Sequence, residues 1–159
     1  MSTKKLIVIL ILSLLLFNLT GCISQNLTDE DLIENLIDTW VEGYQEKDLD
    51  KYMGVYSPLL IVEEQDGGGN TLETYDYVEK YSRIKDIFDA DTSISAVTNA
   101  VNVLVSGLVA TATFFVDYEI TSTIGGIEST DKWSEYVVWT ADKGFGSWSV
   151  NYEKFQKLP

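Results

Sequence analysis

The spacing of hydrophobic positions changes along this chain and divides it into three parts. Residues 6–17 form an apolar run in which Ser13 is the one polar residue. From about residue 28 to residue 88, apolar side chains recur three and four positions apart, which is typical of helices. From about residue 93 onward they alternate with polar ones, as in half-buried strands. The pattern therefore predicts an N-terminal apolar segment, a helical part and a sheet.

The helical part begins with a long amphipathic helix over residues 28–46. Thr28 and Asp31 have the spacing of a capping box at its start. Asp48 can cap a short second helix, which Ser57-Pro58 should end because the residue before a proline disfavours helical geometry. Two helices in succession are thus predicted before residue 58.

A short strand over residues 59–62 and a polar, glycine-rich turn over 65–69 follow. A third helix is predicted over residues 70–88, with Asn70 and Glu73 as its cap pair. Its apolar stripe contains Tyr77, Val78, Tyr81, Ile84 and Phe88.

Four long strands complete the chain. Three are predicted over residues 93–105, 129–141 and 147–155, and the fourth begins at Leu108. One face of this fourth strand holds Leu108, Ala110, Ala112, Phe114, Val116, Tyr118 and Ile120. Long consecutive strands favour an antiparallel meander, and helices before one sheet predict an α+β domain.

The N-terminal segment has the layout of a secretion signal. Two lysines precede the apolar run, and Leu19-Thr20-Gly21-Cys22 follows it. Leu-Thr-Gly-Cys resembles the lipobox of bacterial and archaeal lipoproteins, which implies cleavage before Cys22 and a diacylglyceryl group on its thiol. We expect a signal peptide over 1–21, a lipidated tether over 22–27 and one domain over 28–159. The domain would be held at the cell membrane, facing away from the cytoplasm.

Composition excludes several kinds of chemistry. The formal charge is −14, and the predicted signal peptide contains lysines but no acid, so the mature chain is more acidic still. Such a surface should repel nucleic acid and anionic lipid. The chain has no histidine, which excludes histidine-based triads and histidine-ligated zinc. Asp86, Asp89 and Asp91 lack the glycine and glutamate of a calcium loop, so we expect neither a metal nor a cofactor.

The order of elements resembles that of the NTF2-like superfamily, which includes SnoaL and ketosteroid isomerase. Residues 40–52 resemble its first helix pair, residues 56–63 its entry into the first strand, and residues 146–150 its closing strand. The resemblance implies a cone, in which a strongly curved antiparallel sheet wraps around three N-terminal helices and encloses a pocket. It also implies a possible homodimer through the sheet.

The resemblance carries over only part of a catalytic site. Glu64 matches the position of the general base in isomerase-like members, and Trp40 matches that of a tyrosine that stabilises an oxyanion. Tyr152 lies where many relatives carry a polar cavity residue. Cyclase and dehydratase members rely on a histidine, which this chain lacks.

Glu135 is a second candidate, because it is in phase with Trp133 and Trp139 on its strand. If that face is concave, the carboxyl lies among aromatic side chains and its pKa is raised. If Tyr136 and Val138 face inward instead, Glu135 is an ordinary surface residue. The aromatic residues that could line the pocket, or simply pack the core, are Tyr44, Tyr56, Tyr118, Trp139 and Tyr152.

The sequence thus favours a membrane-anchored lipoprotein with a non-catalytic NTF2-like domain. The domain would bind a small, partly apolar ligand, or a protein partner through its open sheet. An enzyme is the first alternative, namely a proton-transfer isomerase or lyase that uses Glu64 or Glu135. A structural module that dimerises through the sheet is the second alternative.

Overall fold

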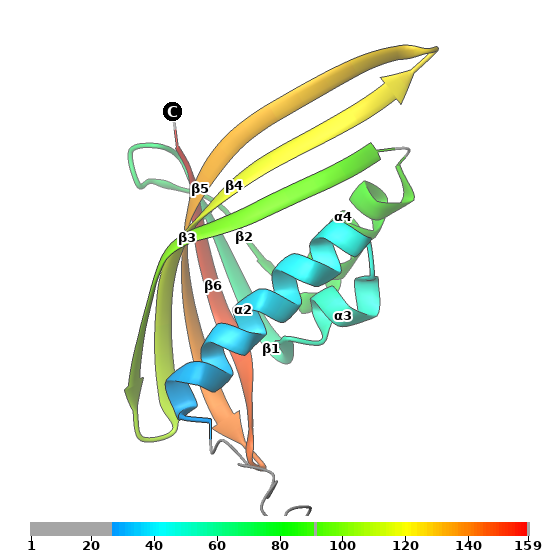
Figure 1. Ribbon diagram of the computed structural model, residues 1–159. Helices are drawn as coiled ribbons and strands as arrows, with labels where there is room; N and C mark the ends of the chain where they lie inside the picture. Colours follow the sequence, from blue (N-terminus) through cyan, green and yellow to red (C-terminus); the bar gives the residue numbers. More distant parts are fainter. Residues whose placement is uncertain (1–26, 91, 159) are drawn as a thin grey trace, which may run out of the picture.

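The computed structural model describes residues 27–90 and 92–158. The predicted signal peptide and Cys22 lie outside the described residues. Within the described residues, three helices and six strands follow one another (Figure 1). They are α2 (Asp29–Glu46), α3 (Leu49–Met53), β1 (Tyr56–Gln65), β2 (Thr71–Asp76), α4 (Tyr77–Asp89), β3 (Thr92–Ser106), β4 (Val109–Ile124), β5 (Ile127–Gly144) and β6 (Ser147–Lys157). None of the described helices combines the length and the apolar character needed to cross a membrane.

The six strands form one sheet in the order β2-β1-β6-β5-β4-β3. The last four strands are the predicted antiparallel meander. One pair of strands is parallel, because β1 runs in the same direction as β6. On its other side β1 forms an antiparallel hairpin with β2. The last strand, β6, therefore lies beside the first strand, β1, in the middle of the sheet. The predicted α+β fold with a curved, mainly antiparallel sheet is confirmed.

The first two helices begin where the local sequence predicts. The Thr28 side chain accepts a hydrogen bond from the backbone N–H of Asp31, and the Asp31 carboxylate accepts one from the backbone of Thr28. Asp48 caps α3 by accepting from the N–H of Lys51. However, α3 already ends at Met53, and Ser57-Pro58 lies inside β1, so the predicted role of the proline as a helix stop is wrong.

The third helix starts later than predicted. Residues 71–76 form strand β2, and the N-cap of α4 is Asp76, which accepts from the N–H of Glu79. The Asp66 carboxylate binds the backbone N–H of Asn70 and so closes the turn between β1 and β2. Residues 71–76 then form their backbone hydrogen bonds with β1. The spacing of apolar residues within this segment does not reveal such a pairing.

Register shifts interrupt the strand pairing at four places, and two of them lie in the long strands β3 and β6. In β3 the register shifts between Asn99 and Asn102, and Ala100 there has a positive φ of 51°. In β6 Asn151 is an extra residue, because Tyr152 pairs with Thr140 while the next pair joins Val150 to Ala141. Bulges bend and twist a strand. Figure 1 shows β3, β4 and β5 bending sharply near their middle, with α2 across the hollow side.

The core lies between the helices and the concave face of this sheet. On β4 the predicted stripe is buried from Ala110 to Tyr118, whereas Leu108 is 66% exposed in the turn before the strand. The largest fully buried side chains are Trp40, Trp139 and Phe114. Trp139 meets Phe114 edge-on at 5.1 Å between ring centroids and Trp40 at 5.6 Å, so aromatic packing joins α2 to the sheet.

Candidate functional site

A cavity of about 170 Å³ lies between the helices and the concave face. Helices α2, α3 and α4 and strands β2, β4, β5 and β6 all contribute side chains to it. These are Trp40, Tyr44, Tyr52, Tyr75, Lys80, Arg83, Ile84, Ile87, Tyr118, Trp133, Glu135, Glu153 and Phe155. We call this space the aromatic cavity.

Stacked and tilted rings form one wall of the aromatic cavity. Trp40 and Tyr44, one helical turn apart on α2, stack with their centroids 6.4 Å apart. Tyr44 meets Tyr118 of β4 edge-on at 5.5 Å, and Tyr118 stacks on Trp133 of β5 at 5.0 Å. Burial raises the pKa of the Tyr44 and Tyr118 hydroxyls, so both stay protonated in ordinary conditions.

A buried ion pair crosses the floor of the cavity. Nζ of Lys80 on α4 lies 2.9 Å from Oε1 of Glu153 on β6, and their side chains are only 5% and 4% exposed. The ammonium also lies 4.9 Å from the centroid of the Tyr56 ring and 5.6 Å from that of Tyr52. Aromatic faces attract a cation, so the two tyrosines help to hold Lys80 in place.

Glu135 brings a second carboxyl group into the cavity. Nε1 of Trp133 donates a hydrogen bond of 2.8 Å to its Oε1. Burial raises the pKa of Glu135, and the charge of Glu153 adds to the increase. The hydrogen bond from Trp133 and the charges of Lys80 and Lys157 act in the opposite direction. Glu135 therefore takes up a proton more readily than an exposed glutamate, and in its charged form it can accept hydrogen bonds from a ligand.

The structure brings together four of the residues singled out from the sequence, Trp40, Tyr44, Tyr118 and Glu135. Tyr56 and Trp139 are buried in the adjoining core, where their rings meet edge-on at 5.9 Å between centroids. The other two candidates, Glu64 and Tyr152, are not among the residues that line the aromatic cavity.

Tyr152 lies on the other face of the sheet. Its hydroxyl donates a hydrogen bond of 2.8 Å to Oε2 of Glu63. Burial and this bond raise the pKa of Tyr152 to about 12, while hydrogen bonds from Thr71, Tyr152 and Gln65 lower that of Glu63. Glu64 is half-buried in β1, where it pairs with Phe155 of β6. The bulge at Asn151 reverses the side-chain phase of β6 and so decides that Glu153, rather than Tyr152, faces the cavity.

Sequence reasoning missed both members of the buried ion pair. Lys80 lies four and eight residues before Ile84 and Phe88, so the helical spacing places it on the buried stripe of α4. The residues predicted there in its stead, Val78 and Tyr81, are 73% and 37% exposed. Glu153 is two residues from Phe155, so both should face the same side of β6. Alternation counted from the apolar Val150, however, predicts that Tyr152 faces inward and Glu153 outward.

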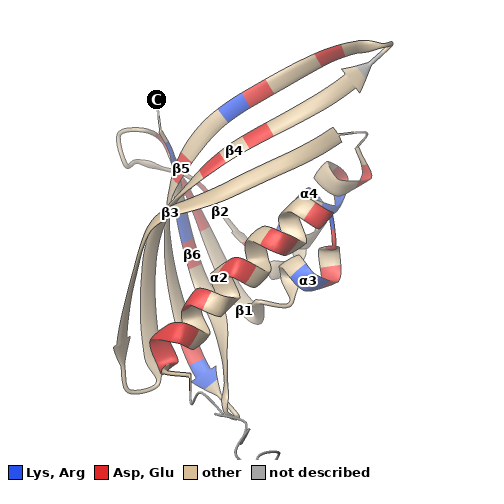
Figure 2. Ribbon diagram, in the orientation of Figure 1, with Lys and Arg blue, Asp and Glu red and all other residues tan. Residues whose placement is uncertain are grey.

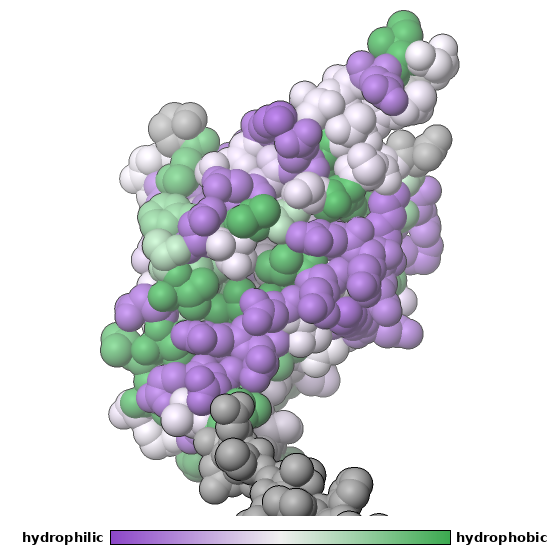
Figure 3. All heavy atoms as spheres, viewed as in Figure 1, coloured by the Kyte–Doolittle hydropathy of each residue, from purple (hydrophilic) through white to green (hydrophobic). Residues whose placement is uncertain are grey.

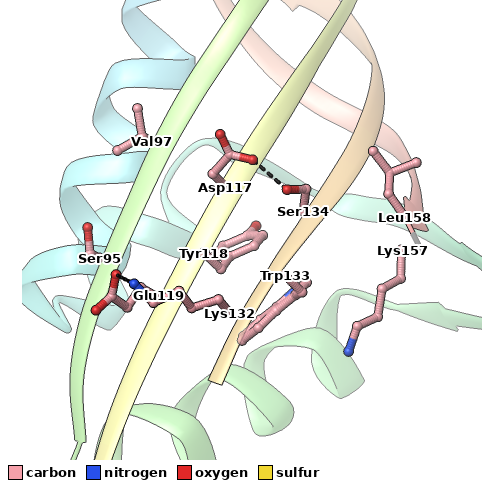
Figure 4. Close-up of a pocket in the computed structure, with 10 residues that line it drawn as sticks. All are labelled: Ser95, Val97, Asp117, Tyr118, Glu119, Lys132, Trp133, Ser134, Lys157 and Leu158. Atoms are coloured by element: carbon pink, nitrogen blue, oxygen red, sulfur yellow. Dashed lines mark hydrogen bonds and ion pairs between the residues drawn. The ribbon is translucent and has the colours of Figure 1, made fainter. Parts of the chain in front are cut away.

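A broader hollow of about 560 Å³ lies beside the bend of the sheet (Figure 4). Its polar side chains largely satisfy one another. The Ser134 hydroxyl donates to Asp117, and Nζ of Lys132 lies 2.7 Å from Oε2 of Glu119. Tyr118 and Trp133 line both spaces. Among the described residues no group of three acidic or cysteine side chains is placed to hold a metal ion.

No protein-family model matches the sequence, and neither does any curated protein. Solved structures do resemble the fold. A conserved protein from Planctomyces limnophilus has a TM-score of 0.71 at 14% identity, over 82% of this chain and 97% of that one. A candidate dehydratase of the NTF2-like family from Streptomyces avermitilis has a TM-score of 0.67 at 12% identity, with 82% and 97% covered. An NTF2-like protein of unknown function from Pseudomonas putida has a TM-score of 0.64 at 14% identity, with 80% and 84% covered. At these identities the likeness shows the fold alone.

Proposed function

We propose that this protein, whose domain has an NTF2-like fold, is a lipid-anchored binding protein that faces away from the cytoplasm. The aromatic cavity would hold a small, partly apolar ligand. The observation that carries the proposal is Glu135, a carboxylate that faces the cavity among aromatic rings and has a single N–H partner there. A concave, mostly aromatic space with few polar groups is typical of ligand sites.

The charges around the cavity indicate which ligand chemistry would fit. Lys80 pairs with Glu153, and Arg83 pairs with Glu73 and Glu79 outside the cavity lining. Glu135 is the remaining charged group in the cavity lining, and it forms no ion pair with any of the described residues. A carboxylate beside aromatic faces favours a cation or a strong hydrogen-bond donor. The volume of about 170 Å³ suits a small ligand or one group of a larger ligand.

Three probes of similar shape test this preference. Benzylamine, benzyl alcohol and benzoate differ mainly in charge, and their binding can be followed by NMR titration of the backbone amides. We expect benzylamine to bind best and benzoate worst. In Glu135→Gln, benzylamine should lose roughly tenfold in affinity, because its cation loses a charged partner in a desolvated site.

Glu119→Gln is the matched control, because Glu119 lies outside the aromatic cavity and pairs with Lys132. This variant should bind benzylamine as the unchanged protein does. Equal binding of the three probes, or a Glu135→Gln variant that binds benzylamine normally, would contradict the proposed ligand chemistry.

The anchor requires its own test. Cys22 is the only cysteine, so its replacement removes the only thiol that a lipid could modify. Cys22→Ser should abolish incorporation of labelled fatty acid and leave the protein soluble or unprocessed. Firm membrane association of this variant would defeat the proposed anchoring.

The second candidate function is proton transfer, and the raised pKa of Glu135 is the observation that favours it. A buried carboxyl with a raised pKa is a common general acid or base in isomerases and lyases. An activity screen would test this function, using Glu135→Gln and Glu64→Gln separately and together. Turnover that survives in the double variant would exclude both carboxylates as the base.

A further inference from the structure

We propose that the domain rests against the lipid bilayer through one defined end. This end consists of the start of α2, the turn between β3 and β4, and the turn between β5 and β6. We call it the anchor-side end, and its exposed apolar residues are Leu27, Leu108 and Phe145. The inference builds on the proposed lipid anchor at Cys22 and adds a protein surface that contacts the lipid.

Direct contacts hold the three segments of the anchor-side end together. Asp29 at the start of α2 forms an ion pair with Lys143 of β5, and Nε1 of Trp148 on β6 donates to the same carboxylate oxygen at 3.1 Å. The backbone N–H of Lys143 donates a hydrogen bond of 2.9 Å to the carbonyl of Leu108. The segments therefore form one connected surface, although they are far apart in the sequence.

The tips of this surface carry apolar side chains that the fold does not use. Leu27 is 50% exposed, Leu108 66% and Phe145 115%. Phe145 also has a positive φ of 50°, a region that a bulky side chain adopts only at a cost. It gains no burial within the domain in return. An aromatic residue held at the tip of a turn can instead be buried by inserting into a membrane interface.

The predicted anchor places this end next to lipid. Leu27, where the described chain begins, comes five residues after Cys22, a distance of at most about 18 Å in extended chain. Figure 3 shows hydrophobic surface near the point where the described chain begins. Short tethering keeps these side chains at high local concentration beside the bilayer, so even modest apolar contacts would orient the domain.

Charge favours a neutral lipid surface. Asp29 is matched by Lys143, but acidic residues at every fourth position continue along the exposed side of α2 (Figure 2). They are Glu30, Glu34, Asp38, Glu42 and Glu46. Anionic head groups would repel this stripe, whereas phosphatidylcholine would not. We therefore commit to a zwitterionic bilayer surface as the partner.

Spin labels on the full, lipidated protein test the contact. Cys22 is the only cysteine and its thiol would carry the lipid, so one added cysteine gives a single labelling site. Phe145→Cys places a nitroxide at the anchor-side end. Ile127→Cys is the matched control, because Ile127 is 75% exposed at the start of β5, and the β4–β5 turn beside it lies at the far end of the molecule from the start of α2 (Figure 1).

The labelled proteins are bound to phosphatidylcholine vesicles and exposed to oxygen, which partitions into lipid, and to a nickel chelate, which stays in water. At position 145 oxygen should relax the nitroxide more than nickel does, and at position 127 the order should be reversed. Vesicle-bound protein with position 145 as accessible to nickel as position 127 would overturn this inference and leave the anchor intact. Protein that does not float with the vesicles would overturn the proposed anchor, and the inference with it.

Discussion

The ammonium of Lys80 and the carboxylate of Glu153 lie 2.9 Å apart with almost no exposure to solvent. The pair connects α4 to β6, across 73 positions of sequence. Both charges lost their hydration on folding, so each depends on the other. The contact therefore fixes how helix α4 lies on the sheet, and with it the shape of the aromatic cavity.

Removing the cation alone should be costly. In Lys80→Met the Glu153 carboxylate stays buried without its charge partner, and we expect a loss of about 3–5 kcal/mol in the free energy of unfolding. Lys80→Met combined with Glu153→Leu should recover most of this loss, since an apolar pair of similar volume replaces the charges. Urea denaturation of Lys80→Met, Glu153→Leu and the double variant measures the interaction free energy between the two side chains. A double variant no more stable than Lys80→Met alone would contradict this account.

The raised pKa of Glu135 predicts how stability depends on pH. The folded state binds this proton more tightly than the unfolded state, so the contribution of Glu135 to stability is fully present below the ordinary value of 4.5 and is lost as pH rises through the folded pKa. Glu135→Gln keeps an oxygen acceptor for Trp133 and removes the titrating charge. The variant should be more stable than the unchanged protein at pH 7, and the two should converge at low pH.

Thermal melts from pH 3.5 to pH 8 measure this difference. Glu128→Gln serves as the control, because Glu128 is exposed at the tip of the β4–β5 hairpin. The Glu128→Gln variant should melt at the same temperature as the unchanged protein at pH 7, because this side chain loses no contact. If Glu135→Gln is less stable than the unchanged protein at pH 7, the Glu135 carboxylate is stabilised rather than strained by its surroundings.

Gly43 sits where α2 passes close to α3. A Cβ added there would lie 2.5 Å from the backbone N of Tyr52 and 2.8 Å from its Cα. Gly43→Ala should therefore destabilise the domain by about 1–3 kcal/mol, even though alanine favours helices. Gly67→Ala in the β1–β2 turn is the control, because its Cβ would meet nothing closer than the carbonyl of Lys157 at 3.7 Å. Urea midpoints of the two variants should differ clearly, and equal midpoints would refute the close approach.

Most elements could be predicted because their signals are local. The capping box at Thr28 and the cap at Asp48 act within one helical turn, and the alternation on β4 extends over a whole strand. The spacing over residues 70–76 is ambiguous and is also compatible with a helix. The pairing partner that makes residues 71–76 a strand, β1, contributes contacts that no short window contains.

The candidate site could be predicted only in part. The phase of Glu135 with Trp133 is a property of one strand, and the structure places both side chains at the cavity. Tyr152 shows the limit of this reasoning, because one extra residue, Asn151, turns it to the outer face and brings Glu153 inward. A bulge depends on the pairing with the neighbouring strand, so its position cannot be predicted from the alternation of polar and apolar residues in β6 alone.

By itself the sequence determined the two hydrophobic periods, the order of helices and meander, the absence of histidine and the single cysteine. Each depends on composition or on spacing within one element. Only the tertiary structure decided which carboxylates share a cavity and which basic side chain neutralises one of them. Lys80, Glu135 and Glu153 come from three elements, and the curvature of the sheet brings them together. Such contacts depend on packing between distant segments, which local patterns do not encode.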